Sequence, residues 1–468
     1  MKNNSLLNIA LGPVLCAICF LFLPDSVFTT PQARMSIGLI LWMSYWWVTT
    51  PVDLAITSLL PIVINAIYPL IPMPDVISKY SSEIVILLLG ASILSVSWVE
   101  TGLDKRIALS ILALVGNNFR KQLLFWFLMS MILSAVINNS VVVATVVPVA
   151  VAMLTYIGQG DISKSKLGSK LLLTIVFAIT VGGLATPLGG AMNLVCVDYF
   201  QQVMGKEYIY NVWVIKFLPV IAVLLISHII FLFRNVKKEE ALEGSREYFQ
   251  KQFQSLPKMS WAETWSFILF IIAVVLSFTR EFYKDLLPEL KPAYVFIFCA
   301  MLTFFIKEDS GKRLMVWKNV QKSVIWDLLF LFAGGLALGA MIQKTGAAQD
   351  IGNIVANANI QSTFVLIFAI MLLTFALSAV TSNTATAAIS LPIVVSVTQG
   401  LGLNPIPYIY AATIGINLSY LFPTSIRSVP VGYGLSAKYL LSEGWKTTVI
   451  TIILMTVMSA ILLPWWAS

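Results

Sequence analysis

The sequence has few charged residues and few of the side chains that hold metals or form disulfide bonds. Only 11% of its 468 residues are Asp, Glu, Lys or Arg, whereas soluble domains have about 25%. It contains four cysteines and one histidine, which argues against a disulfide scaffold or a zinc site. Cys16 and Cys19 form a C-x-x-C inside an apolar run without other metal-binding side chains nearby, so we expect them to be packing residues.

The sequence also lacks the signatures of several functional classes. No basic patch is interleaved with aromatic residues, so the net charge of +8 does not indicate nucleic-acid binding. There is no His/Glu metal motif, no paired-aspartate signature and no Gly-x-Ser-x-Gly elbow, so we do not expect an enzyme. No cleavage site for a signal peptide follows the first residues, and we expect the first apolar run to be an uncleaved anchor.

Long apolar runs dominate what is present. Hydrophobic residues make up 58% of the chain, and several runs reach the roughly 20 residues that cross a bilayer as a helix. The pattern predicts an all-α polytopic membrane protein, with eleven crossings near residues 5–24, 35–50, 54–73, 82–99, 171–200, 212–233, 262–279, 293–307, 325–343, 405–436 and 447–465. Two further apolar stretches, 122–156 and 361–400, are polar in the middle, which favours re-entrant hairpins.

The distribution of basic residues predicts the orientation in the cell membrane (plasma or inner membrane). Lys and Arg residues gather in alternate connecting segments, for example at Lys164, Lys166 and Lys170. Because cytoplasmic loops are rich in Lys and Arg, this bias predicts a cytoplasmic N-terminus and an extracytoplasmic C-terminus. With this orientation, the first hairpin enters the lipid bilayer from the cytoplasm and the second enters from the outer face.

An internal repeat relates the two halves of the chain at an offset of 244 residues. The segment "SAVINNSVVVATVVP", which begins at Ser134, aligns with "SAVTSNTATAAISLP", which begins at Ser378, and Asn139 falls on Asn383. Since the two copies are expected to enter from opposite faces, the repeat has inverted topology. In transporters of this design, binding sites lie near the membrane midplane, where helices are broken.

The repeat divides the chain into two halves and a linker. The predicted parts are a first half at 1–233, with a cytoplasmic-side hairpin near 122–156 and a broken helix near 171–200; a cytoplasmic linker at 234–260; and a second half at 261–468, with an outer-side hairpin near 361–400 and a broken helix near 405–436. The two breaks, "GGLATPLGGAMN" and "YLFPTSIRSVPVGYG", contain Gly and Pro residues that free backbone groups from helical pairing.

The polar hairpin tips are candidate binding elements. An Asn side chain can donate a hydrogen bond to an anion and also offer its carbonyl oxygen to a cation. The helix that follows each tip adds partial positive charge at its N-terminus. Two hairpin tips and two breaks would then meet at the membrane centre. The alternative is that Ser, Thr and Asn only form hydrogen bonds between helices, and that Gly and Pro only mark kinks.

Arg427 is the most informative single residue. It lies within the second broken segment, and no acidic residue occurs between Asp350 and Glu443. Ionisable residues inside a membrane mark functional sites by default, although an Arg can also snorkel to the interface or bind carbonyl groups at a helix end. No paired carboxylates inside the membrane indicate a proton relay, because the acidic residues lie near the ends of predicted spans: Asp53, Glu83, Glu100, Asp198 and Asp327.

At these motifs the sequence resembles the divalent anion/sodium symporter (DASS) family, over nearly the whole chain. The mark of that family is a Ser-Asn-Thr triplet at each hairpin tip. The corresponding triplets of this chain are Asn138-Asn139-Ser140 and Ser382-Asn383-Thr384. The second triplet is therefore intact, and the first keeps its central Asn.

The broken-helix loops fit the family in the first half only. Thr186-Pro187 followed by Asn193 matches a Thr-Pro loop that ends in Asn. In the second half the residues "IRSV", 426–429, stand where the resemblance predicts Thr-Pro-Pro-Asn. Arg427 belongs to this departure, which predicts that the second loop differs in function from the first.

The resemblance implies a homodimer whose protomers each have a scaffold domain and a mobile transport domain that moves like an elevator. It implies that small carboxylate anions bind at the two triplets, Asn138, Asn139, Ser140, Ser382, Asn383 and Thr384, beside the first loop with Thr186 and Pro187; from its charge, we expect Arg427 to bind them as well. It also implies a first sodium site at Ser134, Asn139 and Gly189, and a second at Ser378, Asn383 and Ser425. No cofactor besides a sodium ion is expected.

Arg427 leads us to predict sodium-independent exchange of di- and tricarboxylates. A fixed guanidinium beside the second site would replace the charge of a sodium ion and meet a substrate carboxylate directly. The alternative is a sodium-coupled dicarboxylate symporter, which the intact first loop favours, and a more distant alternative is an anion channel. Succinate, malate, fumarate, 2-oxoglutarate and citrate are all candidate substrates.

Overall fold

The structure is a computed structural model that describes residues 3–234, 236–308, 311–357 and 362–468. Within these ranges the regular structure is helical, apart from two isolated β-bridges. Nine helices in the described ranges are long and apolar enough to cross a membrane, by length and composition. The chain is thus a polytopic α-helical membrane protein, with fewer full-length spans than the eleven expected.

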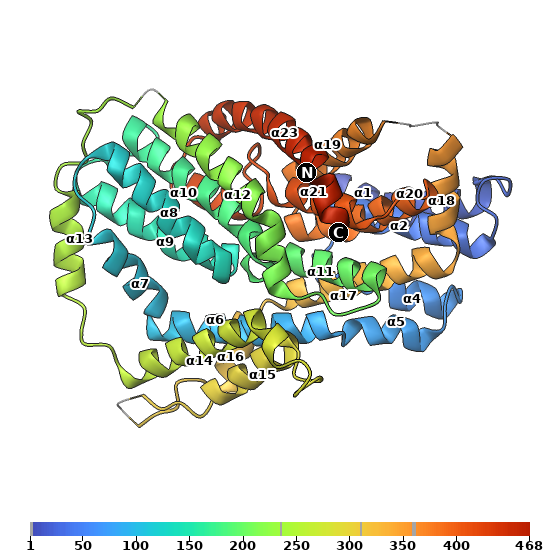
Figure 1. Ribbon diagram of the computed structural model, residues 1–468, viewed down its shortest axis with the longest axis horizontal. Coiled ribbons are helices and arrows are strands. Elements are labelled where there is room, and N and C mark those ends of the chain that lie inside the picture. The colour runs from blue at the N-terminus through green and yellow to red at the C-terminus, as the bar shows by residue number, and fades with distance from the viewer. Residues whose placement is uncertain (1–2, 235, 309–310, 358–361) are drawn as a thin grey trace.

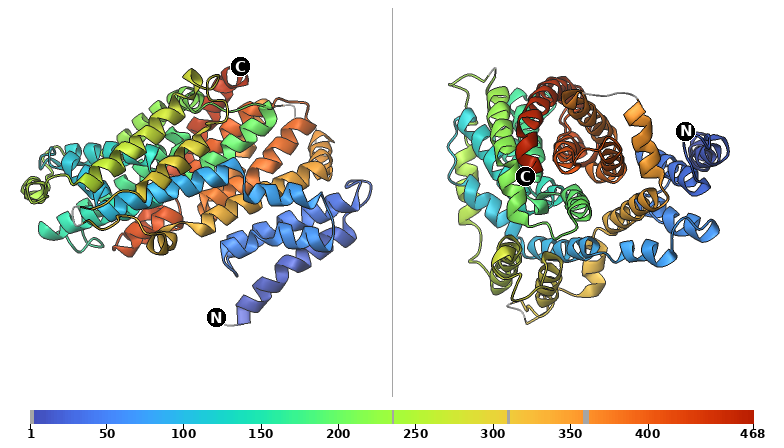
Figure 2. Two further views of the ribbon diagram at one scale, coloured as in Figure 1. Left: turned by 90° about the horizontal axis from the view of Figure 1, so that it is seen from below. Right: turned by 45° about the vertical axis from the view of Figure 1, so that its right-hand side comes forward.

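Five N-terminal helices form a group at one end of the molecule (Figures 1 and 2). They are α1 (Asn3–Phe22), α2 (Pro31–Thr49), α3 (Leu54–Thr57), α4 (Leu60–Ile67) and α5 (Met73–Tyr80). The single crossing expected near 54–73 is interrupted, because α3 ends at Thr57. Pro61 lies in the first turn of α4 and has no N–H group with which to continue the preceding helix.

A second group forms one long edge of the molecule, at the bottom of Figure 1. It consists of α6 (Glu83–Thr101), α14 (Trp261–Phe278), α15 (Pro292–Thr303) and α16 (Trp317–Ser323). α6 packs against both α14 and α15. Gly90 permits this close approach, because a Cβ atom there would lie 2.7 Å from the backbone nitrogen of Ile297.

Two helical hairpins contain the polar triplets. They are α8 (Phe119–Val136) with α9 (Asn139–Tyr156), and α19 (Thr363–Val380) with α20 (Asn383–Gly400). Helices α19 and α20 begin and end 244 residues after α8 and α9. Each hairpin turns within two residues, at 137–138 and 381–382. Residue 361, where we expected the second hairpin to begin, lies outside the described residues.

An interrupted helix follows each hairpin and packs against both of its helices. The first consists of α10 (Lys166–Ala185), the 3₁₀ turn η1 (Pro187–Gly189) and α11 (Ala191–Met204); the second consists of α21 (Ile406–Asn417), the 3₁₀ turn η3 (Ser425–Arg427) and α22 (Ser428–Gly432). Thr186 precedes η1 and Thr424 precedes η3, and both have extended backbone. The two breaks therefore have the same local design.

The remaining helices connect these units. They are α7 (Leu103–Leu112), α12 (Tyr210–Phe233), α13 (Ser245–Gln254), α17 (Trp326–Lys344), α18 (Ala347–Asn357) and α23 (Ala437–Ala467). The expected linker contains α13, which packs against α7 and α9 at the left of Figure 1. There Gln122 Nε2 donates to Ser245 Oγ at 3.0 Å, and the ring of Trp126 packs edge-on against Phe249. The linker is thus held against the first hairpin.

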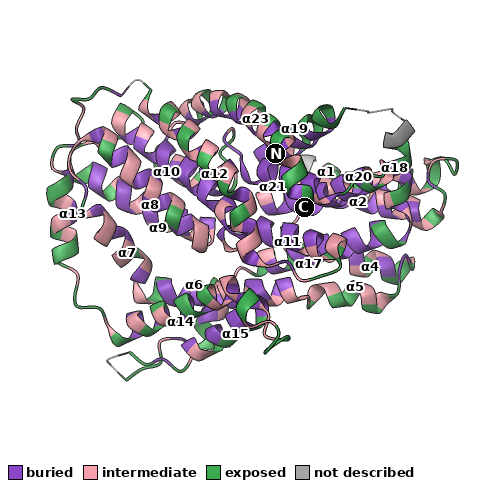
Figure 3. Cartoon of the chain, in the orientation of Figure 1, coloured by how far each residue is buried: buried purple, intermediate pink, exposed green. Residues whose placement is uncertain are grey.

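The core lies around α10 and α21, the two interrupted helices. Nearly every residue of both is buried, as the purple ribbons of Figure 3 show. The rings of Phe177 in α10 and Tyr420, just after α21, lie 4.8 Å apart between centroids. Helices α12, α14 and α23 instead expose large apolar side chains such as Ile226, Ile272 and Ile453, as expected of helices that face lipid.

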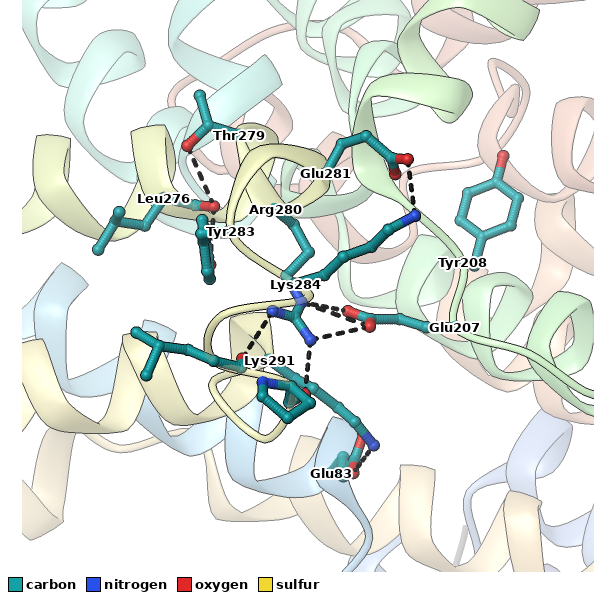
Figure 4. Close-up of polar contacts among 12 residues, drawn as sticks. Glu83, Glu207, Tyr208, Leu276, Thr279, Arg280, Glu281, Tyr283, Lys284 and Lys291 are labelled. Atoms are coloured by element: carbon teal, nitrogen blue, oxygen red, sulfur yellow. Dashed lines mark hydrogen bonds and ion pairs between the residues drawn. The ribbon is translucent and has the colours of Figure 1, made fainter.

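A polar cluster fastens the start of α6 to two loops (Figure 4). Arg280 is 2% exposed, pairs with Glu207 at 3.0 Å and also donates to the backbone oxygens of Leu287 and Pro288. Lys291 pairs with Glu83 at 2.7 Å, and this contact raises the pKa of the Lys291 ammonium. The carboxylate at the start of α6 is therefore neutralised by an adjacent cation.

Candidate functional site

Both polar triplets line one cavity of about 210 Å³. All six residues take part: Asn138, Asn139, Ser140, Ser382, Asn383 and Thr384. The rest of the lining comes from Gly190, Ala191, Met192, Ser425 and Ile426 at the two breaks, and from Leu54, Ile325, Asp327, Leu328 and Leu331. A second, mainly apolar cavity of about 150 Å³ adjoins it and shares Asn138, Gly190 and Leu328 with it.

The first tip presents the N-terminus of α9 to the cavity. Asn138 caps this helix, because its Oδ1 accepts a hydrogen bond from the backbone nitrogen of Ser140 at 2.9 Å. Asn139 is the first helical residue and is 7% exposed. The unpaired N–H groups and the dipole of a helix N-terminus favour an anion at this end.

The second tip presents the N-terminus of α20 in the same way. Ser382 caps the helix, because its Oγ accepts a hydrogen bond from the backbone nitrogen of Ala385 at 3.1 Å. Asn383 Nδ2 donates to Asn417 O at 3.2 Å, which fixes the orientation of the side chain. Two helix N-termini with neutral hydrogen-bonding side chains thus line one small cavity, an arrangement that suits a molecule with two anionic ends.

Behind the first tip, the first loop closes around a small group of oxygen atoms. A Cβ atom on Gly189 would lie 2.8 Å from Ser134 O and 2.7 Å from Gly183 O, so only glycine lets the backbone approach these oxygens so closely. A Cβ atom on Gly183 would lie 3.0 Å from Oδ1 of Asn139. Neutral oxygens at a broken helix are the ligands that sodium takes in transporters. Oxygens of Ser134, Gly183 and Asn139 thus lie close together around Gly189, where the resemblance predicts a sodium site.

The second loop repeats the framework of the first. In the first half, Ser134 Oγ donates a hydrogen bond to Ile179 O (3.0 Å) and Thr186 Oγ1 donates one to Ala135 O. In the second half, Ser378 Oγ donates to Ile416 O (2.7 Å) and Thr424 Oγ1 donates to Ala379 O (3.2 Å). In each half, the serine before the tip and the threonine before the 3₁₀ turn tie the hairpin to the break. These matched contacts place Thr424 in the position of Thr186.

Arg427 stands where the first loop has Gly189. Each is the third residue of its 3₁₀ turn. The guanidinium donates from Nε to Phe422 O (2.6 Å), from Nη1 to Ser419 O (2.9 Å) and Ser419 Oγ, and from Nη2 to Ser378 O (3.3 Å) and Thr424 Oγ1 (2.5 Å). Ser378 O is the equivalent of Ser134 O, which lies close to Gly189. The guanidinium therefore binds the equivalent of an oxygen that the glycine of the first loop approaches closely.

The environment of Arg427 resembles that of a bound cation. The side chain is 1% exposed, and its five N–H groups all have partners within the protein. Those partners are neutral oxygen atoms, and no carboxylate in the described ranges pairs with it. Arg427 does not line the cavity, so a direct contact with a substrate carboxylate would require these hydrogen bonds to break.

The structure corrects the register that we assigned to the second loop. The resemblance equated residues 426–429 with Thr-Pro-Pro-Asn, but the contacts equate Thr424 with the threonine of the first loop. The register error is two residues, because the chain between α21 and η3 is longer than that between α10 and η1. Spacing alone could not reveal this, since the 244-residue offset ends with the hairpins.

The predicted loop residues differ in whether they reach the cavity. Thr186 and Pro187 are buried behind the first tip and do not line the cavity. Ser425 does line it and has a φ of 52°, a left-handed conformation that is uncommon outside glycine. Strain of this kind occurs at functional sites, which agrees with the place of Ser425 in the cavity wall.

Sequence reasoning missed a hydrogen bond that joins the two breaks. Asn417 Nδ2 donates to Asn193 Oδ1 at 2.8 Å, and both side chains are fully buried. Asn193 Nδ2 in turn donates to Gly183 O and Thr186 O. An asparagine in an apolar run near the end of a helix was the available signal, but the partnership spans 224 residues and depends on the packing of α11 against α21.

Comparisons with known proteins identify the family of the chain. A family model described as citrate transporter matches residues 44–415. The sodium-dependent dicarboxylate transporter SdcS of Staphylococcus saprophyticus is 28% identical over 98% of this chain and 92% of that protein. SdcS of Staphylococcus aureus (strain MRSA252) is 29% identical over 99% of this chain and 92% of that protein.

A solved structure has a similar fold. The crystal structure of the Alcanivorax borkumensis YdaH transporter matches with a TM-score of 0.55 and 11% identity, over 83% of this chain and 87% of that one. This likeness concerns the fold alone. The family match covers most of the chain and confirms the resemblance seen in the hairpin triplets. The chain therefore belongs to the citrate transporter family, as a transporter of the DASS type.

Proposed function

We propose that the protein carries small dicarboxylates across the cell membrane together with sodium. The observation that carries this proposal is the cavity of about 210 Å³ between two asparagine-centred helix N-termini. Each N-terminus offers hydrogen-bond donors and partial positive charge to one carboxylate. Apolar side chains of Leu328 and Leu331 also line this cavity and suit a short carbon chain. Four-carbon dicarboxylates such as succinate, fumarate and malate are the candidate substrates.

The coupling to sodium is supported by the first loop and by the relatives. Gly189 packs closely against the backbone oxygens of Ser134 and Gly183, which are neutral oxygens of the kind that bind sodium at broken helices. Sodium is cargo in this proposal, and its charge at the first site would offset part of the charge of a dianion. The relatives named as sodium-dependent dicarboxylate transporters favour the same coupling. This replaces sodium-independent exchange as our preferred interpretation.

Exchange without sodium is the second candidate, and Arg427 is the observation that favours it. The guanidinium occupies the place of a second cation and is always charged. The carrier thus has one positive charge near the second tip with no ion bound there. A carrier with such a built-in charge needs fewer sodium ions to balance a dianion, and in the limiting case it needs none.

The larger movements follow from the same design. We expect the hairpins and interrupted helices to move together as a transport domain, past a scaffold that includes α6, α14 and α15, in an elevator mechanism. We expect two protomers to associate through their scaffolds. The cytoplasmic N-terminus, the extracytoplasmic C-terminus and the opposite entry of the two hairpins remain predictions from the distribution of basic residues.

Uptake by proteoliposomes tests the proposal. Purified protein is reconstituted, and uptake of labelled succinate is measured with an inward sodium gradient or with potassium alone, into vesicles that are empty or preloaded with succinate. Sodium-driven uptake into empty vesicles is the expected result. Uptake that is the same with and without sodium, and that requires dicarboxylate inside the vesicles, would contradict coupling to sodium and establish exchange. Linear, non-saturating flux in both conditions would instead indicate a channel.

A further inference from the structure

Asp327 is the only charged side chain among the residues that line the cavity in the described structure. It lies in the first turn of α17, and its side chain is exposed. An acidic residue is unexpected at a site for dianions, because two negative groups repel each other, and more strongly where water is scarce. The position therefore requires an explanation that the binding of two carboxylates does not provide.

The equivalent position in the first half shows how such a carboxylate is usually neutralised. Glu83 begins α6 just as Asp327 lies at the start of α17, 244 residues later. Glu83 pairs with Lys291 at 2.7 Å and lines a different cavity. The Asp327 carboxylate has no ion pair or side-chain hydrogen bond among the residues that the structure describes. Its negative charge is thus left for whatever enters the cavity.

The arrangement of the cavity walls determines which part of a substrate Asp327 meets. The tips that contain Asn139 and Asn383 form two walls and take the two carboxylates. Apolar side chains, among them Leu54, Leu328 and Leu331, line the same cavity, and so does Asp327. A dicarboxylate held at both ends by the tips keeps its middle carbons inside this cavity. We infer that a hydrogen-bond donor on a middle carbon meets the Asp327 carboxylate, which accepts hydrogen bonds and has free acceptor positions.

We propose that Asp327 selects dicarboxylates that bear a hydrogen-bond donor, a hydroxyl or an ammonium group, on a carbon between the two carboxylates. This inference rests on the proposed function and names the substrate class of the same site. A plain dicarboxylate such as succinate brings charge near Asp327 without a compensating contact. A 2-hydroxy or 2-amino dicarboxylate brings a donor to it, and an ammonium group also removes one unit of net negative charge.

Another explanation is that Asp327 only stabilises α17. An acidic residue in the first turn of a helix interacts favourably with the helix dipole. That role would affect the stability of the protein and leave the choice among substrates unchanged. Substrate preference therefore separates the two explanations, whereas thermal stability alone does not.

Competition for uptake tests the proposal. Proteoliposomes take up labelled succinate in the presence of unlabelled succinate, malate or aspartate, with wild-type protein and with Asp327→Asn and Asp327→Glu. We expect wild type to prefer malate or aspartate to succinate. Asp327→Asn should reduce that preference about tenfold, which corresponds to the loss of one charge-assisted contact. Asp327→Glu, which keeps the charge, should retain it. Loss of preference for malate alone identifies the hydroxyl, and loss for aspartate alone identifies the ammonium group.

A matched control comes from the first half. Glu83→Gln removes the equivalent carboxylate outside this cavity and should leave the preference unchanged. An unchanged preference in Asp327→Asn, with succinate uptake retained, would overturn the inference and leave the proposed function intact. A change in sodium dependence without a change in substrate preference would also overturn the inference, because Asp327 would then act in binding sodium and not in selecting the substrate. Failure of wild type to take up any of the three anions would overturn the proposed function and this inference with it.

Discussion

The two broken-helix loops share a framework and differ at its centre. In both, a threonine before a 3₁₀ turn donates to the backbone of the preceding hairpin, and a serine before the tip donates to the interrupted helix. The first turn ends with Gly189, which packs closely against the backbone oxygens of Ser134 and Gly183. The second ends with Arg427, whose guanidinium binds Ser378 O, the equivalent of Ser134 O, and Ser419 O.

The difference lies at a matched position of the two loops, while the tips remain nearly alike. In the proposed function each tip holds one carboxylate, and positive charge comes from a sodium ion at the first loop and from the Arg427 side chain at the second. A fixed charge needs no ion gradient and contributes no driving force. In this proposal the two loops therefore make different contributions to transport.

The largest expected effect comes from removing the central asparagine of either hairpin tip, the feature that the two halves share. Asn139→Ala and Asn383→Ala each remove the central amide of one tip, and we expect each to reduce uptake of labelled succinate by at least about a hundredfold, since a buried polar contact to a charged group is lost. Asn353→Ala, at an exposed asparagine of α18, is the matched control and should transport normally. If either tip variant transported at near the wild-type rate, the two-tip site would be refuted.

The next prediction removes the charge from the second loop. Arg427→Met keeps much of the volume but leaves the oxygens of Ser378 and Ser419 without their donor, and we expect a loss of stability of about 1–3 kcal/mol for each buried acceptor left unpaired. Arg427→Gly instead copies the first loop and opens a space that sodium can enter. Its uptake should show a steeper dependence on sodium concentration than that of wild type.

Thermal unfolding in detergent and sodium titration of uptake measure these two effects. For Arg427→Gly, the unfolding temperature should rise with added sodium more than it does for wild type, because an ion that binds the folded state stabilises it. An Arg427→Gly protein with the sodium response of wild type would show that the second loop holds no latent cation site.

A smaller effect is expected when the first loop is closed. Gly189→Ala would place a Cβ atom 2.7 Å from Gly183 O and 2.8 Å from Ser134 O, within the space assigned to sodium. We expect the sodium concentration for half-maximal uptake to rise about tenfold, a change of about 1.4 kcal/mol. Gly432→Ala, where a Cβ atom meets nothing within 4 Å, is the control. Equal sodium responses of the two variants would argue against a first-loop site.

The smallest effect compares the two threonines. Thr424→Val removes a hydrogen bond to Ala379 O and one from Arg427, and we expect a loss of about 1–2 kcal/mol. Thr186→Val also removes the cap that accepts from the backbone nitrogens of Leu188 and Gly189, so its loss should be the larger of the two. Unfolding followed by tryptophan fluorescence measures both. The reverse order would indicate that the two turns are held differently.

The hairpin tips could be predicted from the sequence because their signals are local. Polar triplets in apolar runs, repeated at a fixed offset, identify Asn139 and Asn383, and the helices begin at those residues. Capping by Asn138 and Ser382 follows from the ordinary preference of Asn and Ser for that position. The apolar runs likewise predicted a helical membrane protein, although Pro61 interrupts one run that we expected to cross without a break.

The surroundings of Arg427 could not be predicted from the sequence. Four of its five hydrogen bonds depend on Ser419, Thr424 and Ser378, which come together only when α19 packs against α21. The link between Asn193 and Asn417 likewise requires both interrupted helices to be in place. Residue type showed that Arg427 was unusual, but only tertiary contacts show that it is engaged by the protein and withdrawn from the cavity.

The ratio of sodium to dicarboxylate transported tests the account most directly. Proteoliposomes that contain wild-type protein or Arg427→Gly take up labelled sodium and labelled succinate in the same experiment, and the two initial rates are compared. With one ion site open and one filled by an always-charged guanidinium, wild type should move about one sodium ion per succinate, and Arg427→Gly about one more. A wild-type ratio of two or more, or of zero, would contradict the assignment of a sodium site to the first loop and of a fixed cation to the second.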